Sequence, residues 1–159
     1  MSAGLTLPEN KMNKDALIHR EFIYEQASFP SCHASTLIET PSGLLAAWFG
    51  GTDEGEPDVS IWLAHRRLTS WTNPVEVVHG RQPEGSQLPC WNPVLWRAPS
   101  GAVLLFYKVG PSPRAWWGMV TASADVGRTW STPARLPEGI LGPIKNKPVL
   151  IEDALLCGA

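Results

Sequence analysis

The feature that most constrains this chain is an internal repeat. Residues 32–49, CHASTLIETPSGLLAAWF, align without a gap with residues 90–107, CWNPVLWRAPSGAVLLFY. The aligned cysteines and the aligned Pro-Ser-Gly triplets are both 58 residues apart. A third copy begins at Pro148, 55 residues after Pro93. Repetition at this period indicates one supersecondary unit stacked on its own copies.

Each complete copy predicts four short strands. The Pro-Ser-Gly triplet predicts the turn of the first hairpin, where glycine accepts a positive φ. Residues 44–49 are apolar at successive positions, which is typical of a strand covered on both faces. The expected strands are 33–39, 43–49, 58–65 and 74–79 in the first copy and 92–97, 102–108, 115–122 and 132–136 in the second. Four strands per repeat of this length predict an all-β fold, the β-propeller.

The repeat also predicts how the chain is divided. We expect an N-terminal tail at 1–17 and a partial propeller over 18–159, with blades at about 33–79 and 91–136 and the start of a third at 147–159. Residues 17–25 read as one further strand that would complete the last blade. A closed ring needs about four to eight blades, so the remaining blades are expected to be missing from this chain, and the chain alone is expected to be poorly stable.

Composition excludes several classes of function. The net charge is −2 and Lys and Arg form no run, so no nucleic-acid partner is expected. The N-terminus lacks an apolar signal region and no stretch is apolar enough to span a bilayer, which predicts a cytoplasmic protein without membrane contact. Three cysteines without C-x-x-C spacing predict free buried thiols. No metal site or cofactor is expected.

Residues 123–130, SADVGRTW, fit the Asp-box pattern Ser-x-Asp-x-Gly-x-Thr-Trp at every fixed position. Ser123 and Asp125 are expected to accept hydrogen bonds from turn amides. Gly127 would take the strained position and Trp130 would cover the turn. The box is therefore interpreted as structural.

With this box, the chain resembles the sialidase (neuraminidase, BNR-repeat) family over about residues 18–159. Residues 33–37, 48–58 and 142–148 are similar to its bacterial predicted-neuraminidase branch. The resemblance implies a sialidase-type propeller whose full-length form is an exo-glycosidase that acts on a carbohydrate substrate, an acidic or sialylated glycan. This fragment by itself is expected to be inactive. The nucleophilic tyrosine and an arginine pair of that family would come from later blades. His33 stands where the family has an arginine that clamps the sialic acid carboxylate. An imidazole cannot replace that bidentate contact at equal strength, which favours another acidic glycan.

A propeller of this type brings remote segments together on its top face, the end where first strands begin and second strands end. The segments expected there are the start of the first strand at 33, the loop 50–58, residues 91–92 with the loop 108–115, and the link 141–147. The candidate catalytic residues are His33, Glu54 and Asp58, as proton donors or acceptors. The candidate substrate-binding residues are Asn92, Lys108, Trp116, Lys145 and Asn146.

Each of these residues also has a structural interpretation. His33 could be a buried, hydrogen-bonded core histidine, and Asp58 could cap the third strand. Trp116 could belong to the core, and Lys108, Lys145 and Asn146 could be solvated loop residues. Two other functions stay open for the whole chain: a polysaccharide lyase acting on a uronic-acid glycan, and a non-catalytic propeller that binds carbohydrate or protein.

Overall fold

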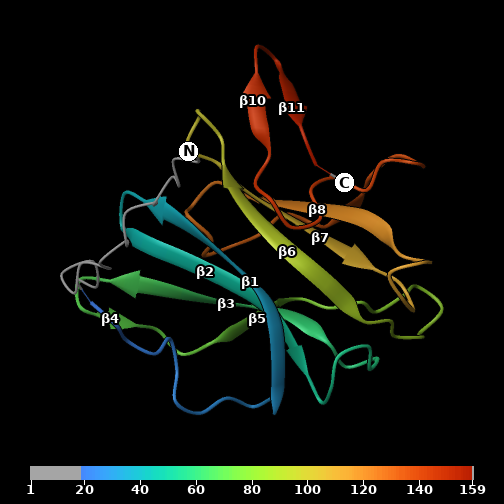
Figure 1. The fold of residues 1–159 in the computed structure, drawn as a ribbon, viewed down its shortest axis with the longest axis horizontal. Coiled ribbons are helices and arrows are strands. Elements are labelled where there is room, and N and C mark those ends of the chain that lie inside the picture. The colour runs from blue at the N-terminus through green and yellow to red at the C-terminus, as the bar shows by residue number, and fades with distance from the viewer. Residues whose placement is uncertain (1–18, 159) are drawn as a thin grey trace, which may run out of the picture.

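The computed structural model describes residues 19–158, in which every regular element is a β-strand. No helix occurs among these residues, and hence none that is long and apolar enough to cross a membrane. The strands form two larger antiparallel sheets and one separate hairpin (Figure 1).

The first sheet is a meander that starts at the inner strand. The order is β1 (Ser31–Thr40), β2 (Gly43–Gly51) and β3 (Ser60–Arg67), followed by β4 (Ser70–Trp71) and β5 (Val75–Val78). Both β4 and β5 pair with β3, so the expected fourth strand is divided into two short pieces.

The second sheet repeats this arrangement. It consists of β6 (Cys90–Arg97), β7 (Val103–Val109), β8 (Trp117–Ser123) and β9 (Ala134–Arg135) in that order. The third copy forms β10 (Val149–Ile151) and β11 (Ala154–Leu156), a hairpin that stands apart from both sheets (Figure 1). Its apolar side chains at Val149, Leu150 and Ile151 are exposed.

The repeat extends to the backbone conformation of the inner strands. The pairing of β1 with β2 shifts register between His33 and Thr36, and that of β6 with β7 shifts between Trp91 and Val94. Within these β-bulges the equivalent residues Ala34 and Asn92 have φ values of 53° and 42°. A positive φ is uncommon for a residue other than glycine, and bulges re-aim neighbouring side chains. Both bulges lie at the strand starts that the repeat places on the top face.

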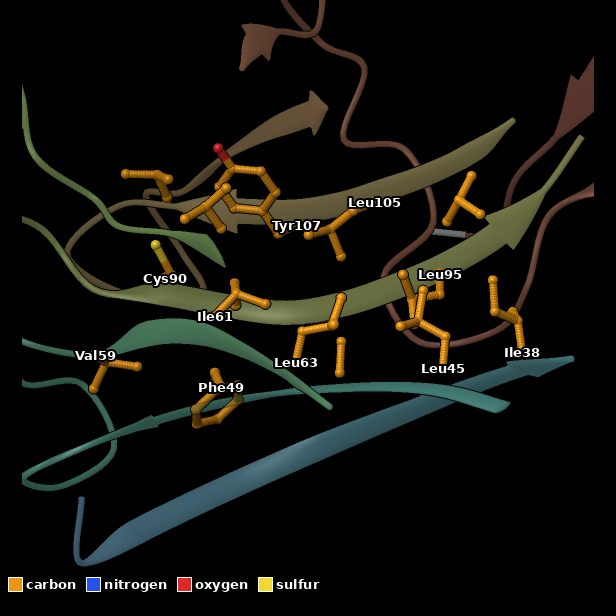
Figure 2. Packing of buried hydrophobic residues seen from close by; sticks show 14 residues of the cluster. Ile38, Leu45, Phe49, Val59, Ile61, Leu63, Cys90, Leu95, Leu105 and Tyr107 are labelled. Carbon is orange, nitrogen blue, oxygen red and sulfur yellow. The ribbon is translucent and has the colours of Figure 1, made fainter. Parts of the chain in front are cut away.

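The main core lies between the two sheets. Leu45, Ile61, Leu95 and Leu105 are fully buried there, and they come from one face of each sheet (Figure 2). At one end the Cys90 amide donates a hydrogen bond to the Val59 carbonyl at 2.9 Å, which fixes the blades side by side. Successive blades therefore pack face to face, as the apolar character of both strand faces predicts.

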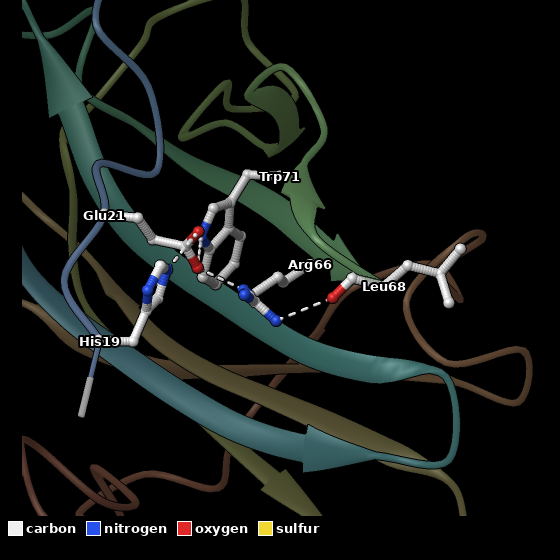
Figure 3. A network of polar contacts seen from close by, with 5 residues as sticks. All are labelled: His19, Glu21, Arg66, Leu68 and Trp71. Carbon is white, nitrogen blue, oxygen red and sulfur yellow. Dashed lines mark hydrogen bonds and ion pairs between the residues drawn. The ribbon is translucent and has the colours of Figure 1, made fainter.

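The expected strand at 17–25 is wrong for residues 19–25, which form no strand; residues 17 and 18 lie outside the described range. This segment instead covers the other face of the first sheet. Ile23 and Tyr24 pack against a second buried cluster that contains Trp48. Glu21 accepts hydrogen bonds from Arg66 Nε and Trp71 Nε1 (Figure 3). The segment is held by side-chain contacts, whereas the expectation assumed that it pairs with another strand.

Candidate functional site

The top face and the Asp-box lie at opposite ends of the blades. On the top face, the Trp91 ring packs against Gly55, where an added Cβ would be 3.5 Å from the ring. Together with the Cys90–Val59 hydrogen bond, this contact brings the loop between β2 and β3 beside the start of β6. The Asp-box joins β8 to β9 and packs against Leu45, beside the hairpin turn of the first blade.

The structure brings His33 and Glu54 together. His33 Nδ1 lies 4.0 Å from Glu54 Oε2, and the two side chains are 71% and 52% exposed. This separation allows an ion pair when the imidazole is protonated. His33 is therefore not the buried core histidine of the structural interpretation. Because the pair joins an inner strand to a loop about 20 residues away, the backbone brings two proton-transfer groups to one place.

Asp58 stabilises the loop that carries Glu54. Its Oδ2 accepts a hydrogen bond from the Thr52 amide at 2.9 Å and another from the Thr52 hydroxyl at 2.6 Å. These bonds close residues 52–58 into a compact loop. The geometry fits the structural alternative, in which Asp58 holds the start of the third strand, and a catalytic role for Asp58 stays a prediction.

Aromatic side chains continue from His33 across both blades. The centroid of His33 is 5.7 Å from that of Phe49, Phe49 is 6.1 Å from Trp91, and Trp91 is 6.0 Å from Trp116, all in edge-on contact. Trp91 is buried and its Nε1 donates to the Gly110 carbonyl at 2.8 Å, whereas Trp116 is only half-buried. Of the two tryptophans in this row, Trp116 is thus the one whose ring a sugar could reach.

A cavity of about 310 Å³ opens beside His33. Its lining comes from the start of β1, from Trp48 and from the N-terminal segment: Ile23, Tyr24, Cys32, His33, Ala34, Ser35 and Trp48. The volume is within the range of small-molecule sites.

Lys108 differs from the expectation. Its side chain was expected to point into the top-face mouth, but it is fully buried, and its Nζ donates to the Pro143 carbonyl at 2.6 Å. The reason is that Lys108 lies on the sheet face that the link 141–147 covers. Burial lowers the pKa of the Lys108 ammonium to about 8.

The remaining predicted residues are more dispersed. Asn92 is half-buried at the bulge of β6, and Lys145 and Asn146 are exposed on the link. Within residues 19–158, no hydrogen bond or ion pair connects these three to His33 or Glu54. Their role in substrate binding stays a prediction.

Lys147 was missed by the sequence reasoning. Its Nζ donates to Thr36 Oγ1 at 3.3 Å and to the Leu95 carbonyl at 3.1 Å, and the Leu95 amide in turn donates to Thr36 Oγ1 at 3.2 Å. The lysine thereby links the inner strands of both blades to the start of the third copy. Lys147 precedes Pro148, which opens the third copy, and it lies in the segment 142–148 that resembles the family, but neither signal specifies these contacts.

The Asp-box has the hydrogen bonds expected of it. Ser123 Oγ accepts from the Gly127 amide at 2.7 Å, and Asp125 Oδ1 accepts from the Thr129 amide at 2.8 Å. The Thr129 hydroxyl donates to Asp125 Oδ2, and these bonds hold the pKa of Asp125 below its usual range. Gly127 has a φ of 83°, and the Trp130 ring lies beside it.

The three cysteines differ in their exposure. Cys32, Cys90 and Cys157 are free thiols, but only Cys90 is fully buried, so the expectation of three buried thiols is wrong for Cys32, which is exposed. Within the described range, no three His, Cys, Asp or Glu side chains gather closely enough to hold a metal ion.

The buried lysine gives a prediction about pH. Between about pH 8 and pH 10.5 the folded state holds Lys108 neutral while the unfolded chain still binds the proton, so the contribution of Lys108 to stability should rise with pH across this window. The buried Cys90 thiol, whose pKa is raised by burial, acts in the opposite direction above about pH 9, so the contribution of Lys108 is read from the difference between variants. We expect a gain of up to about 2–3 kcal/mol in the free energy of unfolding. Lys108→Met should lack it, and the exposed-lysine control Lys145→Met should keep it. Urea denaturation at several pH values measures the difference. Equal pH profiles for Lys108→Met and the unmodified protein would contradict the burial of the amine.

A match to a protein family defines the class of protein to which this chain belongs. Residues 42–158 match the family described as the BNR repeat-like domain, and because this is most of the chain, the chain belongs to that family. No curated protein matches it.

Among solved structures, the chain is similar to one described as Hadza microbial sialidase Hz136, with a TM-score of 0.57 and 16% sequence identity. The match covers 65% of this chain and 25% of that sialidase, so this chain spans only part of its length. At this identity the likeness shows the fold. The fold is an all-β propeller of sialidase type, present here as two blades and part of a third.

Proposed function

We propose that this protein is a carbohydrate-active enzyme that cleaves an acidic glycan on the top face, with His33 and Glu54 as its proton-transfer pair. The observation that supports this most is the 4.0 Å approach of the two exposed side chains. It occurs beside a cavity and at the end of the blades opposite the Asp-box. The family and the propeller fold agree with a carbohydrate substrate.

The pair is suited to moving one proton. Glu54 faces His33 Nδ1, and none of residues 19–158 forms a hydrogen bond with His33 Nε2, which leaves this nitrogen for substrate. In a hydrolytic reaction the protonated imidazole or the Glu54 carboxylic acid would protonate the leaving glycosidic oxygen while water adds at the anomeric carbon. Glu54 would orient the imidazole and stabilise its positive charge.

The preferred substrate should carry a uronic acid rather than a sialic acid. A guanidinium clamps a carboxylate with two parallel hydrogen bonds, which the imidazole of His33 cannot form. A sialoside would therefore lose its strongest expected contact at this position. Cleavage of a uronic-acid glycan requires a positioned acid or base at the reacting centre, and the imidazole of His33 can supply one.

A lyase is the second candidate, and the same pair favours it. In this reaction neutral His33 would take the proton next to the uronic acid carboxylate, and the glycosidic oxygen would leave with its bonding electrons to give an unsaturated sugar. Hydrolysis adds one water to the products, whereas elimination adds none.

A glycan panel tests the proposal. The full-length protein is incubated with a polyuronic acid, a sialylated oligosaccharide and a neutral oligosaccharide, and the masses of the products are measured by mass spectrometry. We expect the polyuronic acid to be cleaved fastest. Products heavier by water would identify the hydrolase, and unsaturated products would identify the lyase. Binding without cleavage of any glycan would contradict the enzyme and leave the non-catalytic propeller.

A further inference from the structure

A second cavity, of about 350 Å³, lies at the outer corner of the second blade. It is enclosed by the start of β8 and by residues 135–141, which run from the last residue of β9 toward the third copy. The Leu136 amide donates to the Gly118 carbonyl at 2.9 Å, which fixes this segment against β8. The principal lining residues are Trp116, Trp117, Arg135, Glu138, Ile140 and Leu141.

The cationic group of this cavity is held in place by an aromatic ring. The Arg135 guanidinium carbon lies 4.6 Å from the centroid of the Trp117 ring. Such stacking orients the planar fork and leaves its N–H groups free. Within the described part of the chain, no carboxylate lies within ion-pair distance of Arg135, and its side chain donates no hydrogen bond. Arg135 is therefore an oriented cation without an anionic partner there.

The cavity combines the groups that bind an acidic sugar. A pyranose ring presents an apolar face that packs on tryptophan, hydroxyls that donate to a carboxylate, and, in a uronic acid, a carboxylate that accepts from a guanidinium. Trp116 offers the half-buried ring, Glu138 an exposed carboxylate on the rim, and Arg135 the fork. A nucleic acid or a phosphate cluster would need more positive charge than this single arginine.

We infer that this cavity is a sugar-binding subsite for a pyranose that carries a carboxylate, with Arg135 holding the carboxylate and Trp116 stacking on the ring. Trp116 also contacts Trp91 in the aromatic row that begins at His33. One acidic glycan could then extend from the His33–Glu54 pair to this subsite. Only the choice of a sugar as ligand rests on the proposed function.

Binding of two monosaccharide probes tests the subsite. Methyl glucuronide and methyl glucoside differ only in the carboxylate, and NMR titration of the tryptophan indole signals measures the affinity of each. We expect the glucuronide to bind at least about tenfold more tightly, because hydrogen bonds to charged groups contribute more than this factor. Arg135→Ala should remove that preference, and Arg135→Lys should keep only part of it, since lysine lacks the fork.

The matched control is Arg114→Ala, which removes the same charge from an exposed position near Trp116 that does not line the cavity. Melting curves show whether each variant folds. Equal affinity for the two probes, unchanged glucuronide binding in Arg135→Ala, or no binding would overturn the subsite. Loss of glucuronide binding in His33→Ala would also overturn it. Glucuronide binding without cleavage of any glycan would support the subsite and contradict only the proposed enzyme.

Discussion

Replacing Gly43 by alanine is expected to destabilise the protein by at least about 4 kcal/mol, in the range that only severe steric or strain effects reach. Gly43 closes the hairpin between β1 and β2 with a φ of 123°. An added Cβ would lie 2.0 Å from the Arg66 carbonyl oxygen on β3. That oxygen belongs to the backbone of a paired strand, so it cannot move aside unless the sheet shifts.

The second copy of the repeat supplies the matched control. Gly101 occupies the same place in its Pro-Ser-Gly turn and has a φ of 91°, but the nearest atom to an added Cβ is Arg97 Nη2 at 3.9 Å. Gly101→Ala should therefore cost only the positive φ, about 1–2 kcal/mol. Urea denaturation of both variants measures the difference. Equal destabilisation would contradict the collision with Arg66.

The hairpins and the Asp-box could be predicted because their determinants are local. A Pro-Ser-Gly turn needs only its own residues, and SADVGRTW carries both the hydrogen-bonding side chains and the glycine that its turn requires. The repeat gives each predicted element a second, independent copy. Because Cys32 and Cys90 align together with the turns that follow them, the amino-acid sequence alone indicates how the inner strands of the two blades correspond.

Features that depend on distant segments could not be predicted in this way. The apolar side chains near Ile23 are compatible with a segment that pairs with another strand and equally with one that covers a sheet face. The local sequence cannot separate these two cases, because strand pairing depends on distant residues. Strand alternation places Lys108 on the face it shares with Phe106, but the sequence does not show that the link 141–147 covers that face. The two bulges could not be predicted either, because the equivalent residues Ala34 and Asn92 are of different types and no common residue type marks the positive φ.

In the candidate site, too, some features could be predicted from the sequence and others depended on distant segments. The approach of Glu54 to His33 followed from placing the loop 50–58 at the end where β1 begins, which the topology of a blade dictates. The two hydrogen bonds that Asp58 accepts from Thr52 were not predicted, because the sequence does not specify this pairing. Arg135 was not singled out, because its stacking on Trp117 joins two strands that pair only in the folded sheet.

Replacing His33 by alanine is expected to lower turnover of a uronic-acid glycan by about 10²-fold or more, the usual effect of removing a general acid or base. Folding should be nearly unchanged, since the side chain is mostly exposed and its ring packs edge-on against Phe49. His79→Ala is the matched control, because it removes an exposed histidine beyond β5 that does not belong to the pair.

The role of His33 is tested most sharply by the turnover of a polyuronic acid and of a sialoside by the full-length protein and its His33→Ala and His79→Ala variants, with melting curves for all three. The predicted result is faster cleavage of the polyuronic acid, a fall of about 10²-fold or more in His33→Ala alone, and equal melting temperatures. Strong cleavage of the sialoside that survives the loss of His33 would contradict the proposed role of His33 and favour an ordinary sialidase whose chemistry lies elsewhere.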